Sequence, residues 1–474
     1  RHRKMSVTIK SKTDDFLTLE VKIPITRDML QGENNIQNAV NEVGLAATGH
    51  LLELHDAEGK PLVMGSVRMT SKGLLPKAYQ APYGEVYIKR HVYQTSKGGA
   101  VYCPLEDSAR IVLTSTPRFA AQVSRKAAEM AASHVVEDLK MNHNRSVAKN
   151  VVQRISEFVA TGIQAKEEEW TYDTPPQEVE IATISTGLDG ACVLMATGEW
   201  RQAMAGTISL YDPKGKRCHT TYIAAAPEHG KETFKKRLKH EMDHVFGLYP
   251  NARRIGIADG AADNWEFLEK HTTKQTLDFY HATEYVADVA NCLFYSDELR
   301  QKWVENRCHQ LKRFETGASD LLDEVVTLYD HVLKGTVPKF MKFKTKSIEC
   351  EDESGYLPAF DKRAKIKEEK IEVTSLFKKH VDTKPLDAFV SYFRNNIEKS
   401  RMNYADNLAE NLPIGSGVTE SACKMIIKAR LCQSGMRWKE KGMDVVLSLR
   451  CLARSDGKWE QFWQKVNQYG FPKE

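Results

Sequence analysis

The chain of 474 residues contains 68 basic and 63 acidic side chains, which gives a formal net charge of +5. So small an excess excludes binding to nucleic acid through bulk charge, and any such surface has to come from local clusters. The length predicts two to four domains, and the lack of an 18-residue apolar run excludes a membrane-spanning helix. The nine cysteines form no CxxC pair and follow no secretory leader, so we expect reduced thiols in a cytoplasmic protein.

Residues 1–115 alternate short β-like runs with turn residues, which predicts a small β-rich module. The runs GEVYIKRHVY and AVYCPL flank a glycine-bearing turn at Lys97, so we expect them to form a β-hairpin.

Residues 116–170 change to helical spacing, beginning at a Thr-Pro pair that is typical of a helix start. Two short helices are predicted around 133–140 and 147–160, separated by the polar turn KMNHNRS. This pattern favours a helix-turn-helix-like DNA-binding region, although a helical hairpin inside an ordinary bundle has the same pattern. The second helix would offer DNA the outward side chains of Lys149, Gln153 and Arg154. The acidic, proline-bearing segment AKEEEWTYDTPPQE then predicts a linker.

Residues 171–281 have the pattern of an α/β core. Three successive β-like runs, followed by a helix and two more strands, predict a sheet that begins with antiparallel strands. The first run leads to Asp189 in TGLDG, the fourth strand ends at Asp259, and the fifth ends at Asp278 and His281. Acids at strand ends meet at one edge of a sheet, where ligands usually bind, so we expect a site there.

Residues 282–405 are predicted to form an all-helical insertion. One segment between its helices, KGTVPKFMKFKTK, interleaves phenylalanine with lysine and is the best local candidate for phosphate contact. A solvated loop gives the same pattern. The lysines proposed for this contact are Lys342 and Lys344.

Residues 406–474 are expected to complete the core and to add C-terminal helices. In PIGSGVTESACKMIIKARLCQSGMRW, helical spacing starts near residue 417 with Ser416 as a plausible N-cap, and Glu420 lies in the first turn. A carboxylate alone in a basic field suits a metal ion held over a phosphate backbone, whereas the alternative is that it only complements the helix dipole. The basic residues expected to contact DNA here are Lys424, Lys428, Arg430 and Arg437.

Asp189, Asp259 and Glu420 thus lie on three separate elements, as a site for two divalent ions requires. A β-β-β-α-β-α-β order with acids at these places is the arrangement of the RNase H-like nucleases and transposases. The expected fold class is therefore α/β: an RNase H-like mixed sheet interrupted by the all-helical insertion, and preceded by the β-rich module and the helix-turn-helix-like region.

The sequence resembles bacterial insertion-sequence transposases of the DDE type, particularly the Kra subgroup, which is itself similar to the Mutator-like transposases. The match rests on STGLDG, IADGAADNW, LDFYH and, most specifically, IGSGVTESACKMIIKARLCQSGMRW. It covers roughly residues 85–450 and is clearest in the second half of the chain.

The resemblance implies a Mg²⁺-dependent enzyme in which Asp189, Asp259 and Glu420 bind two ions, with Mn²⁺ able to substitute. It implies that Asp278 and His281 form a D-x-x-H pair, in a chemical or a structural role, and that Arg437 and Trp438 approach DNA. The implied partners are double-stranded DNA, both the terminal inverted repeats and the target, and at least a second copy of the chain, in the bacterial cytoplasm at the nucleoid. Relatives commonly carry a cysteine pair where this chain has only Cys103, so no zinc is expected.

The function expected from this resemblance is cleavage at the ends of a mobile element by metal-activated water, followed by joining of the 3′-hydroxyl to target DNA. Two alternatives stay open. One is a DNA-binding regulator that derives from a transposase and has lost the chemistry. The other is a stand-alone metal-dependent DNA nuclease.

Overall fold

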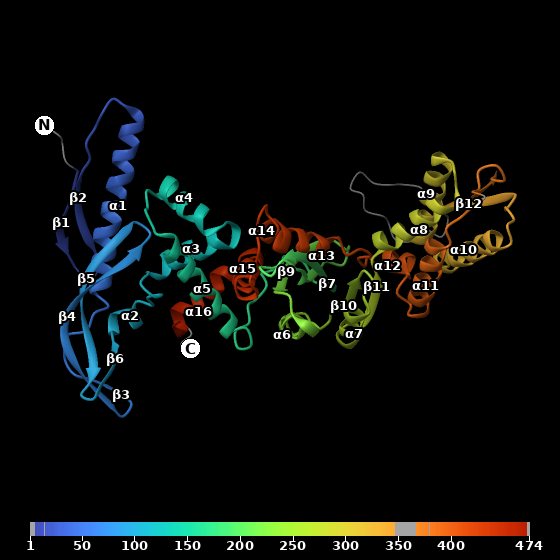
Figure 1. Ribbon diagram of the computed structural model, residues 1–474. Coiled ribbons are helices and arrows are strands. Elements are labelled where there is room, and N and C mark those ends of the chain that lie inside the picture. The colour runs from blue at the N-terminus through green and yellow to red at the C-terminus, as the bar shows by residue number, and fades with distance from the viewer. Residues whose placement is uncertain (1–4, 14, 347–365, 379, 472–474) are drawn as a thin grey trace. The chain divides into compact units, whose positions relative to one another are not determined.

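The computed structural model describes residues 5–13, 15–346, 366–378 and 380–471 (Figure 1). The protein is mixed α/β, and its chain divides into two compact units. The first unit comprises residues 1–173, 194–199 and 430–474, and the second comprises 174–193 and 200–429. In the described residues no helix combines the length and the apolar composition needed to cross a bilayer.

The N-terminal part of the first unit consists of two small sheets that both pack against the long helix α1 (Met29–Glu53). The first sheet pairs β1 (Ser6–Lys12) with β2 (Leu17–Lys22). The second has the order β3 (Leu62–Met64), β4 (Val67–Ala81), β5 (Gly84–Thr95) and β6 (Gly98–Tyr102). The hairpin predicted from the sequence is confirmed as β5 and β6, with Thr95 paired to Gly98 across the turn.

Helix α1 was not predicted, because its sequence is rich in glycine and asparagine, which are poor helix formers. Packing explains why these residues are helical. A Cβ atom at Gly44 would lie 2.2 Å from the Tyr83 ring, and one at Gly49 would meet Val86 at 3.6 Å. Gly44 therefore allows α1 to approach Tyr83 closely, whereas Gly49 makes only an ordinary contact, and this tertiary packing outweighs local propensity.

The rest of the first unit is a helical bundle that joins segments far apart in the sequence. Helices α3, α5 and α15 pack against one another around a core that includes Phe119, Ile155, Leu449 and Phe462. The bundle helices are α3 (Pro117–Glu129), α4 (Ala132–His143), α5 (Lys149–Ala165), α15 (Glu440–Arg454) and α16 (Lys458–Tyr469). The short α2 (Pro104–Ser108) packs against β5 of the N-terminal sheet. The segment predicted as 406–474 is therefore divided, since residues from 430 onward belong to this bundle.

The second unit is built on a five-stranded mixed sheet with the order β11-β10-β7-β8-β9. Strand β10 is parallel to both β7 and β11, whereas β8 and β9 are antiparallel. The strands are β7 (Thr183–Leu194), β8 (Trp200–Tyr211), β9 (Arg217–Ala225), β10 (Arg253–Ala258) and β11 (Lys274–Leu277).

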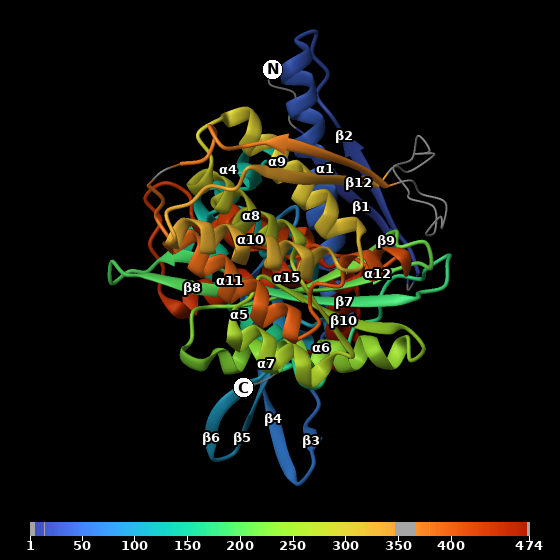
Figure 2. The ribbon, with the colours of Figure 1, turned by 90° about the vertical axis from the view of Figure 1, so that its right-hand side faces the viewer.

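Helices cover both faces of this sheet (Figure 2). On one face lie α6 (Glu232–Leu248), which follows the short η1 (His229–Lys231), and α7 (Ala262–His271). On the other face α13 (Gly417–Ala422) and the π-helical turn η2 (Cys423–Lys428) pack against β8, and the helix continues into α14 (Ala429–Leu431).

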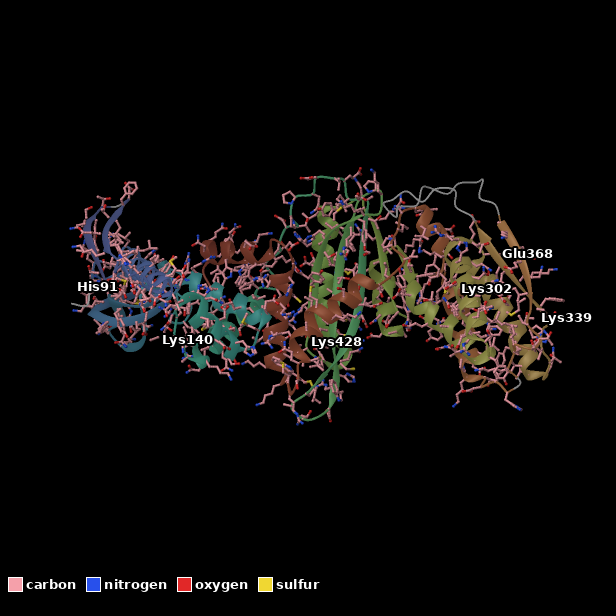
Figure 3. The ribbon with its side chains drawn as sticks, turned by 90° about the horizontal axis from the view of Figure 1, so that it is seen from above. His91, Lys140, Lys302, Lys339, Glu368 and Lys428 are labelled. Atoms are coloured by element: carbon pink, nitrogen blue, oxygen red, sulfur yellow. The ribbon has the colours of Figure 1, made fainter. Side chains whose placement is uncertain are left out.

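The insertion between β11 and α13 is helical in large part but not all-helical as predicted. Its helices are α8 (Phe279–Leu293), α9 (Asp297–Arg313), α10 (Gly317–Leu333), α11 (Lys384–Glu398) and α12 (Tyr404–Ala409). Strands β12 (Phe340–Lys346) and β13 (Ile366–Glu372) add an antiparallel pair. The lysine-rich run forms β12 because Met341 and Phe343 are buried while Lys342 is exposed, which is the alternation of a half-buried strand. Lys302, Lys339 and Glu368 are exposed on this insertion (Figure 3).

Eight of the nine cysteines are free thiols, whereas Cys350 lies outside the described residues.

Candidate active site

Three aspartates lie in one row across adjacent strands of the second unit. Ile257 of β10 pairs with Gly187 of β7, and Asp259 and Asp189 each lie two residues further along. Ala258 pairs with Leu277 of β11, so Asp278 is also in register with Asp259. Parallel register therefore brings Asp189, Asp259 and Asp278 to the same level of the sheet, as expected from the sequence.

Asp189 lies within β7 and not at its end, because the strand continues through TGLDG to Leu194. Its Oδ1 accepts a hydrogen bond from the Gly190 N–H at 2.6 Å, and its Oδ2 accepts one from the Cys423 thiol at 3.5 Å. Burial raises the pKa of Asp189, and the nearby charge of Asp259 adds to the rise. The carboxylate is therefore poorly solvated and close to a like charge.

Gly187 allows the helix that bears Glu420 to lie directly on the sheet. A Cβ atom at this position would be 2.1 Å from Oγ1 of Thr419, so only glycine fits. Thr419 Oγ1 is also hydrogen-bonded to Thr207 Oγ1 of β8 at 2.7 Å, and both threonines are buried. Because residues i and i+2 of a strand share a face, Asp189 points to the same side as Gly187, toward α13 and η2.

Glu420 lies in the first turn of α13, and Ser416 connects it to Asp278. The Ser416 hydroxyl is 2.5 Å from Asp278 Oδ2 and 3.3 Å from Glu420 Oε1, and its single hydrogen can be donated to either. Ser416 is the N-cap by position, as predicted, but its side chain bonds these carboxylates and not the helix backbone. Burial and then the Asp278 charge raise the pKa of Glu420.

The π-helical turn η2 brings further groups to the acids. It places the Cys423 thiol against Asp189, and burial together with this carboxylate raises the thiol pKa well above its ordinary value. Lys424 and Lys428 of the same turn are exposed, and their charges act on Glu420 and Asp189 respectively. Lys428 is labelled in Figure 3. A π-turn inside an α-helix is rare and frequently marks a functional site.

Asp259 and His281 lie beside an aromatic cluster. The Tyr392 hydroxyl, from α11 of the insertion, donates to the Asp259 carbonyl at 2.6 Å, and its ring stacks on Tyr285 with centroids 4.1 Å apart. Gly260 has φ +124°, and a Cβ atom there would be 2.9 Å from the Tyr392 ring. The sequence contains no local sign of the Tyr392 contact, which spans 133 residues.

His281 was predicted at the end of a strand, but it lies in the first turn of α8. The strand ends at Leu277, and Asp278 caps the helix by accepting a hydrogen bond from the Tyr280 N–H at 3.0 Å. The His281 Nδ1 is 3.0 Å from a Glu284 carboxylate oxygen, and its ring packs edge-on against Tyr285 and Tyr392. Asp278 is 1% exposed, so its hydrogen bonds make it part of the framework of the site.

The donor chemistry of the site fits a divalent cation such as Mg²⁺. Carboxylate oxygens are its preferred ligands, and the raised pKa values of Asp189 and Glu420 come in part from neighbouring acids whose repulsion a cation would relieve. Within the described residues, however, no group of three or more His, Cys, Asp or Glu side chains is close enough together to hold an ion. The acids are available in two pairs, Asp189 with Asp259 and Glu420 with Asp278.

The residues expected to contact DNA do not share one unit. Lys149, Gln153 and Arg154 are exposed on α5 of the first unit, after a connection in which Asn144 adopts a left-handed conformation. Helix α5 begins at Lys149. Lys342 and Lys344 lie on β12 in the second unit, where Lys342 pairs with Glu368 at 3.4 Å.

Arg430 differs most from expectation, since it is buried in the first unit, whereas Trp438 beside it is half-buried. Arg430 is 5% exposed, and its guanidinium carbon lies 5.4 Å from the centre of the Trp438 ring. The Trp438 indole N–H donates to the Leu431 carbonyl at 2.9 Å, and its backbone N–H donates to Leu194. The Arg430 side chain is therefore buried, whereas Arg437 next to Trp438 is exposed.

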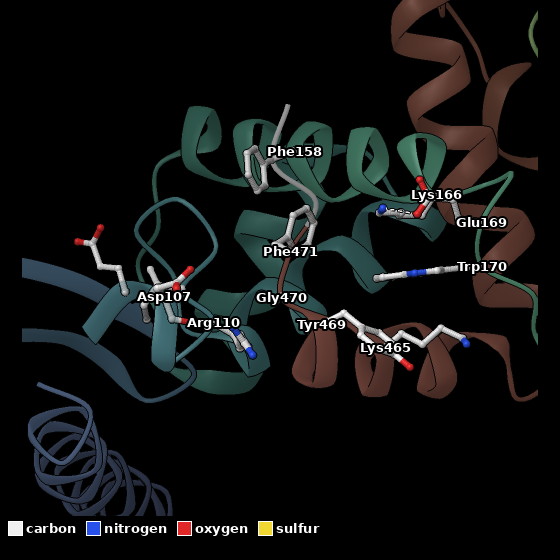
Figure 4. A pocket seen from close by; sticks show the side chains of 12 residues that line it. Asp107, Arg110, Phe158, Lys166, Glu169, Trp170, Lys465, Tyr469, Gly470 and Phe471 are labelled. Atoms are coloured by element: carbon white, nitrogen blue, oxygen red, sulfur yellow. Dashed lines mark hydrogen bonds and ion pairs between the residues drawn. The ribbon is translucent and has the colours of Figure 1, made fainter. Parts of the chain in front are cut away.

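The first unit contains a cavity of about 1100 Å³, which is not lined by any of the candidate active-site acids (Figure 4). Phe158, Trp170 and Phe471 contribute apolar surface, and Lys166 is paired with Glu169 at 2.5 Å. The cavity is lined by both acidic and basic side chains, so its lining favours neither an anionic nor a cationic ligand.

The comparisons with known proteins add little. No protein-family model matches the chain, and no curated protein sequence matches it either. Among solved structures, a crystal structure of NurA bound to dAMP and manganese is similar at 11% identity with a TM-score of 0.11, over 56% of this chain and 64% of the NurA chain. The match thus spans less than two thirds of that protein, and a score this low carries no argument about fold or function.

Proposed function

We propose that the chain is a metal-dependent DNA transposase of the DDE type with an RNase H-like core. The observation that carries the proposal is the placement of Asp189, Asp259 and Glu420 on neighbouring elements of one sheet. The proposal is supported by the mixed sheet of order β11-β10-β7-β8-β9 and by helix α13, which bears Glu420 and packs against β8.

The residues that would hold divalent ions are Asp189, Asp259 and Glu420. When bound, such ions activate water or a 3′-hydroxyl and stabilise the leaving oxygen of a phosphodiester. Ser416 and Asp278 orient the Glu420 carboxylate, and the contact between Thr419 and Thr207 fixes its helix on the sheet. Lys424 and Lys428 would attract the phosphate backbone to the acids.

DNA recognition is assigned to the first unit, where Lys149, Gln153 and Arg154 are exposed on a helix that follows a short turn. Side chains on the second helix of such a pair commonly reach base edges and phosphates. Because two ends of an element have to be held together, we infer that the active form contains at least two copies of the chain.

The test is an in vitro reaction with purified protein, Mg²⁺ and labelled DNA that carries the sequences flanking the gene. Wild type is expected to cleave the DNA and join its 3′-ends to a target plasmid, and Asp259→Asn and Glu420→Gln are expected to do neither while still binding DNA. Lys465→Gln, in the first unit, is the control and should react normally. Cleavage without joining would support the nuclease alternative, and binding without cleavage in Mg²⁺ or Mn²⁺ would support the regulator.

A further inference from the structure

A second cavity in the first unit, of about 340 Å³, is rich in positive charge. It lies between the start of α4, helices α5 and α15, and the segment 436–438. Its charged lining residues are Lys149, Arg430, Arg437 and Glu157, so the cations exceed the acid by two. Trp438 and Leu449 supply part of an apolar wall.

Arg430 lines this cavity with hydrogen-bond donors that have no partner. Its Nη2 donates to the Met130 carbonyl at 3.1 Å, but among the described residues its Nε and Nη1 have no hydrogen-bond acceptor. Buried donors of a charged group are costly when they are unpaired, and native proteins almost always satisfy them. An arginine that is 95% buried with two free donors therefore indicates a missing acceptor.

The surrounding protein does not supply this acceptor. The acid that acts on Arg430 is Glu129, which already binds Arg450 at 3.0 Å, Arg454 at 2.6 Å and Arg125 at 3.1 Å. Burial and then Arg450 lower the pKa of Arg430 to about 10, so the group is still charged at neutral pH. An anion entering the cavity would neutralise it.

We propose that this cavity binds a terminal phosphate group, that is, a phosphate monoester. A dianionic monoester matches the charge excess of two, and one of its oxygens can accept from the unpaired Nε–H or Nη1–H of Arg430. Lys149 is the first residue of α5, whose N-terminus has no side-chain cap and adds positive potential. The Nε and Nη1 atoms of Arg430 are enclosed, so a phosphate has to enter the cavity end-on, as the terminus of a strand or a small molecule does and a phosphate in the middle of a duplex does not.

Two sources carry this chemistry, the 5′-end of a DNA strand and a free mononucleotide. In either case the sugar and base would lie against Trp438 and Leu449. Binding of a DNA 5′-end rests on the DNA binding proposed above, whereas binding of a free mononucleotide does not depend on it.

Binding in metal-free buffer separates this proposal from the chemistry of the acids. Fluorescence anisotropy with the full chain would compare a short single strand bearing a 5′-phosphate with the same strand bearing a 5′-hydroxyl. We expect the phosphorylated strand to bind about tenfold more tightly. Arg430→Gln and Lys149→Gln should each remove most of this preference, and Lys465→Gln should keep it. Because Lys149 is exposed, its variant tests the site even if Arg430→Gln does not fold.

Calorimetry with a nucleoside 5′-monophosphate distinguishes the two sources. Affinity equal to that of the phosphorylated strand assigns the cavity to free nucleotide, and much weaker affinity assigns it to a strand end. The proposal is overturned if neither the monophosphate nor the 5′-phosphate on the strand has a measurable effect. It is also overturned if the preference survives in Lys149→Gln and in a folded Arg430→Gln.

Discussion

Replacing Gly187 with alanine tests whether the site depends on the close approach of α13 to β7. The new Cβ atom would lie 2.1 Å from Thr419 Oγ1, whereas a normal contact needs about 3.5 Å, so the two elements must separate by about 1.4 Å. Overpacking of this kind costs about 1–3 kcal/mol of the free energy of unfolding. Glu420 follows Thr419 directly, so the same displacement should lower the cleavage rate by roughly 100-fold.

A double-variant cycle identifies the cause. Thr419→Ala alone removes the hydrogen bond to Thr207 and should destabilise the protein by about 1–3 kcal/mol, because a buried hydroxyl is left unpaired. In Gly187→Ala/Thr419→Ala the clashing oxygen is gone, and the nearest remaining atom of residue 419 is Cβ, at 3.2 Å. The double variant should therefore be more stable than the sum of the two single losses predicts, by about 1 kcal/mol or more.

Urea denaturation measures these free energies, and the cleavage assay measures the rates. Gly247→Ala is the matched control, because a Cβ atom at this exposed position of α6 meets nothing within 4 Å. It should be neutral or slightly stabilising, as Gly→Ala usually is within a helix. Strictly additive losses, or a Gly187→Ala variant with unchanged stability, would refute the steric explanation.

Three further predictions concern the acids, the aromatic cluster and DNA binding. A carboxyl pKa that is raised on folding means that the native chain holds more protons than the unfolded chain between the two pKa values, so stability should fall as pH rises through that range. Glu420→Gln should flatten this pH dependence of Tm. Mg²⁺ should raise the Tm of wild type, and it should raise the Tm of the variant much less. Equal increases in Tm with Mg²⁺ would contradict an ion at Glu420. Tyr392→Phe removes the hydrogen bond to the Asp259 carbonyl but keeps the stacking on Tyr285, so it should cost about 1 kcal/mol in urea denaturation, and a loss near zero would show that the bond is unimportant. Arg154→Ala should weaken DNA binding and reduce its salt dependence without changing Tm, and unchanged affinity at physiological salt would remove α5 from the interface.

The row of aspartates could be predicted because buried strands have a clear sequence pattern. Asp259 follows the short apolar run IGIA, Asp278 follows the short strand KQTL, and the parallel register then places them side by side. The position of Asp189 within its strand could not be predicted in the same way. The glycines of TGLDG look like a turn in sequence, whereas in the structure Gly187 and Gly190 lie in β7, where they allow Thr419 and Gln202 to approach.

Contacts between distant segments account for most of what the sequence did not reveal. Tyr392 reaches Asp259 from the insertion, and Arg430 is buried by helices at both ends of the chain. The run KGTVPKFMKFKTK was interpreted as a candidate for phosphate contact or as a solvated loop, and not as a strand, because lysines dominate it. The burial pattern of residues 340–346 depends on α9, which packs against β12 and supplies Lys302 above the Phe343 ring.

The order in which the chain visits the two units has a practical consequence for dissecting the protein. The chain passes from one unit to the other at 173/174, 193/194, 199/200 and 429/430, so four peptide bonds join them. A truncated protein that ends at residue 173 would lack α15 and α16, and with them Leu449 and Phe462, which complete the core around Phe119 and Ile155. We expect such a fragment to aggregate or remain unfolded. Dividing the gene at a single position therefore does not yield a folded fragment with the proposed recognition helix and a second folded fragment with the proposed catalytic sheet.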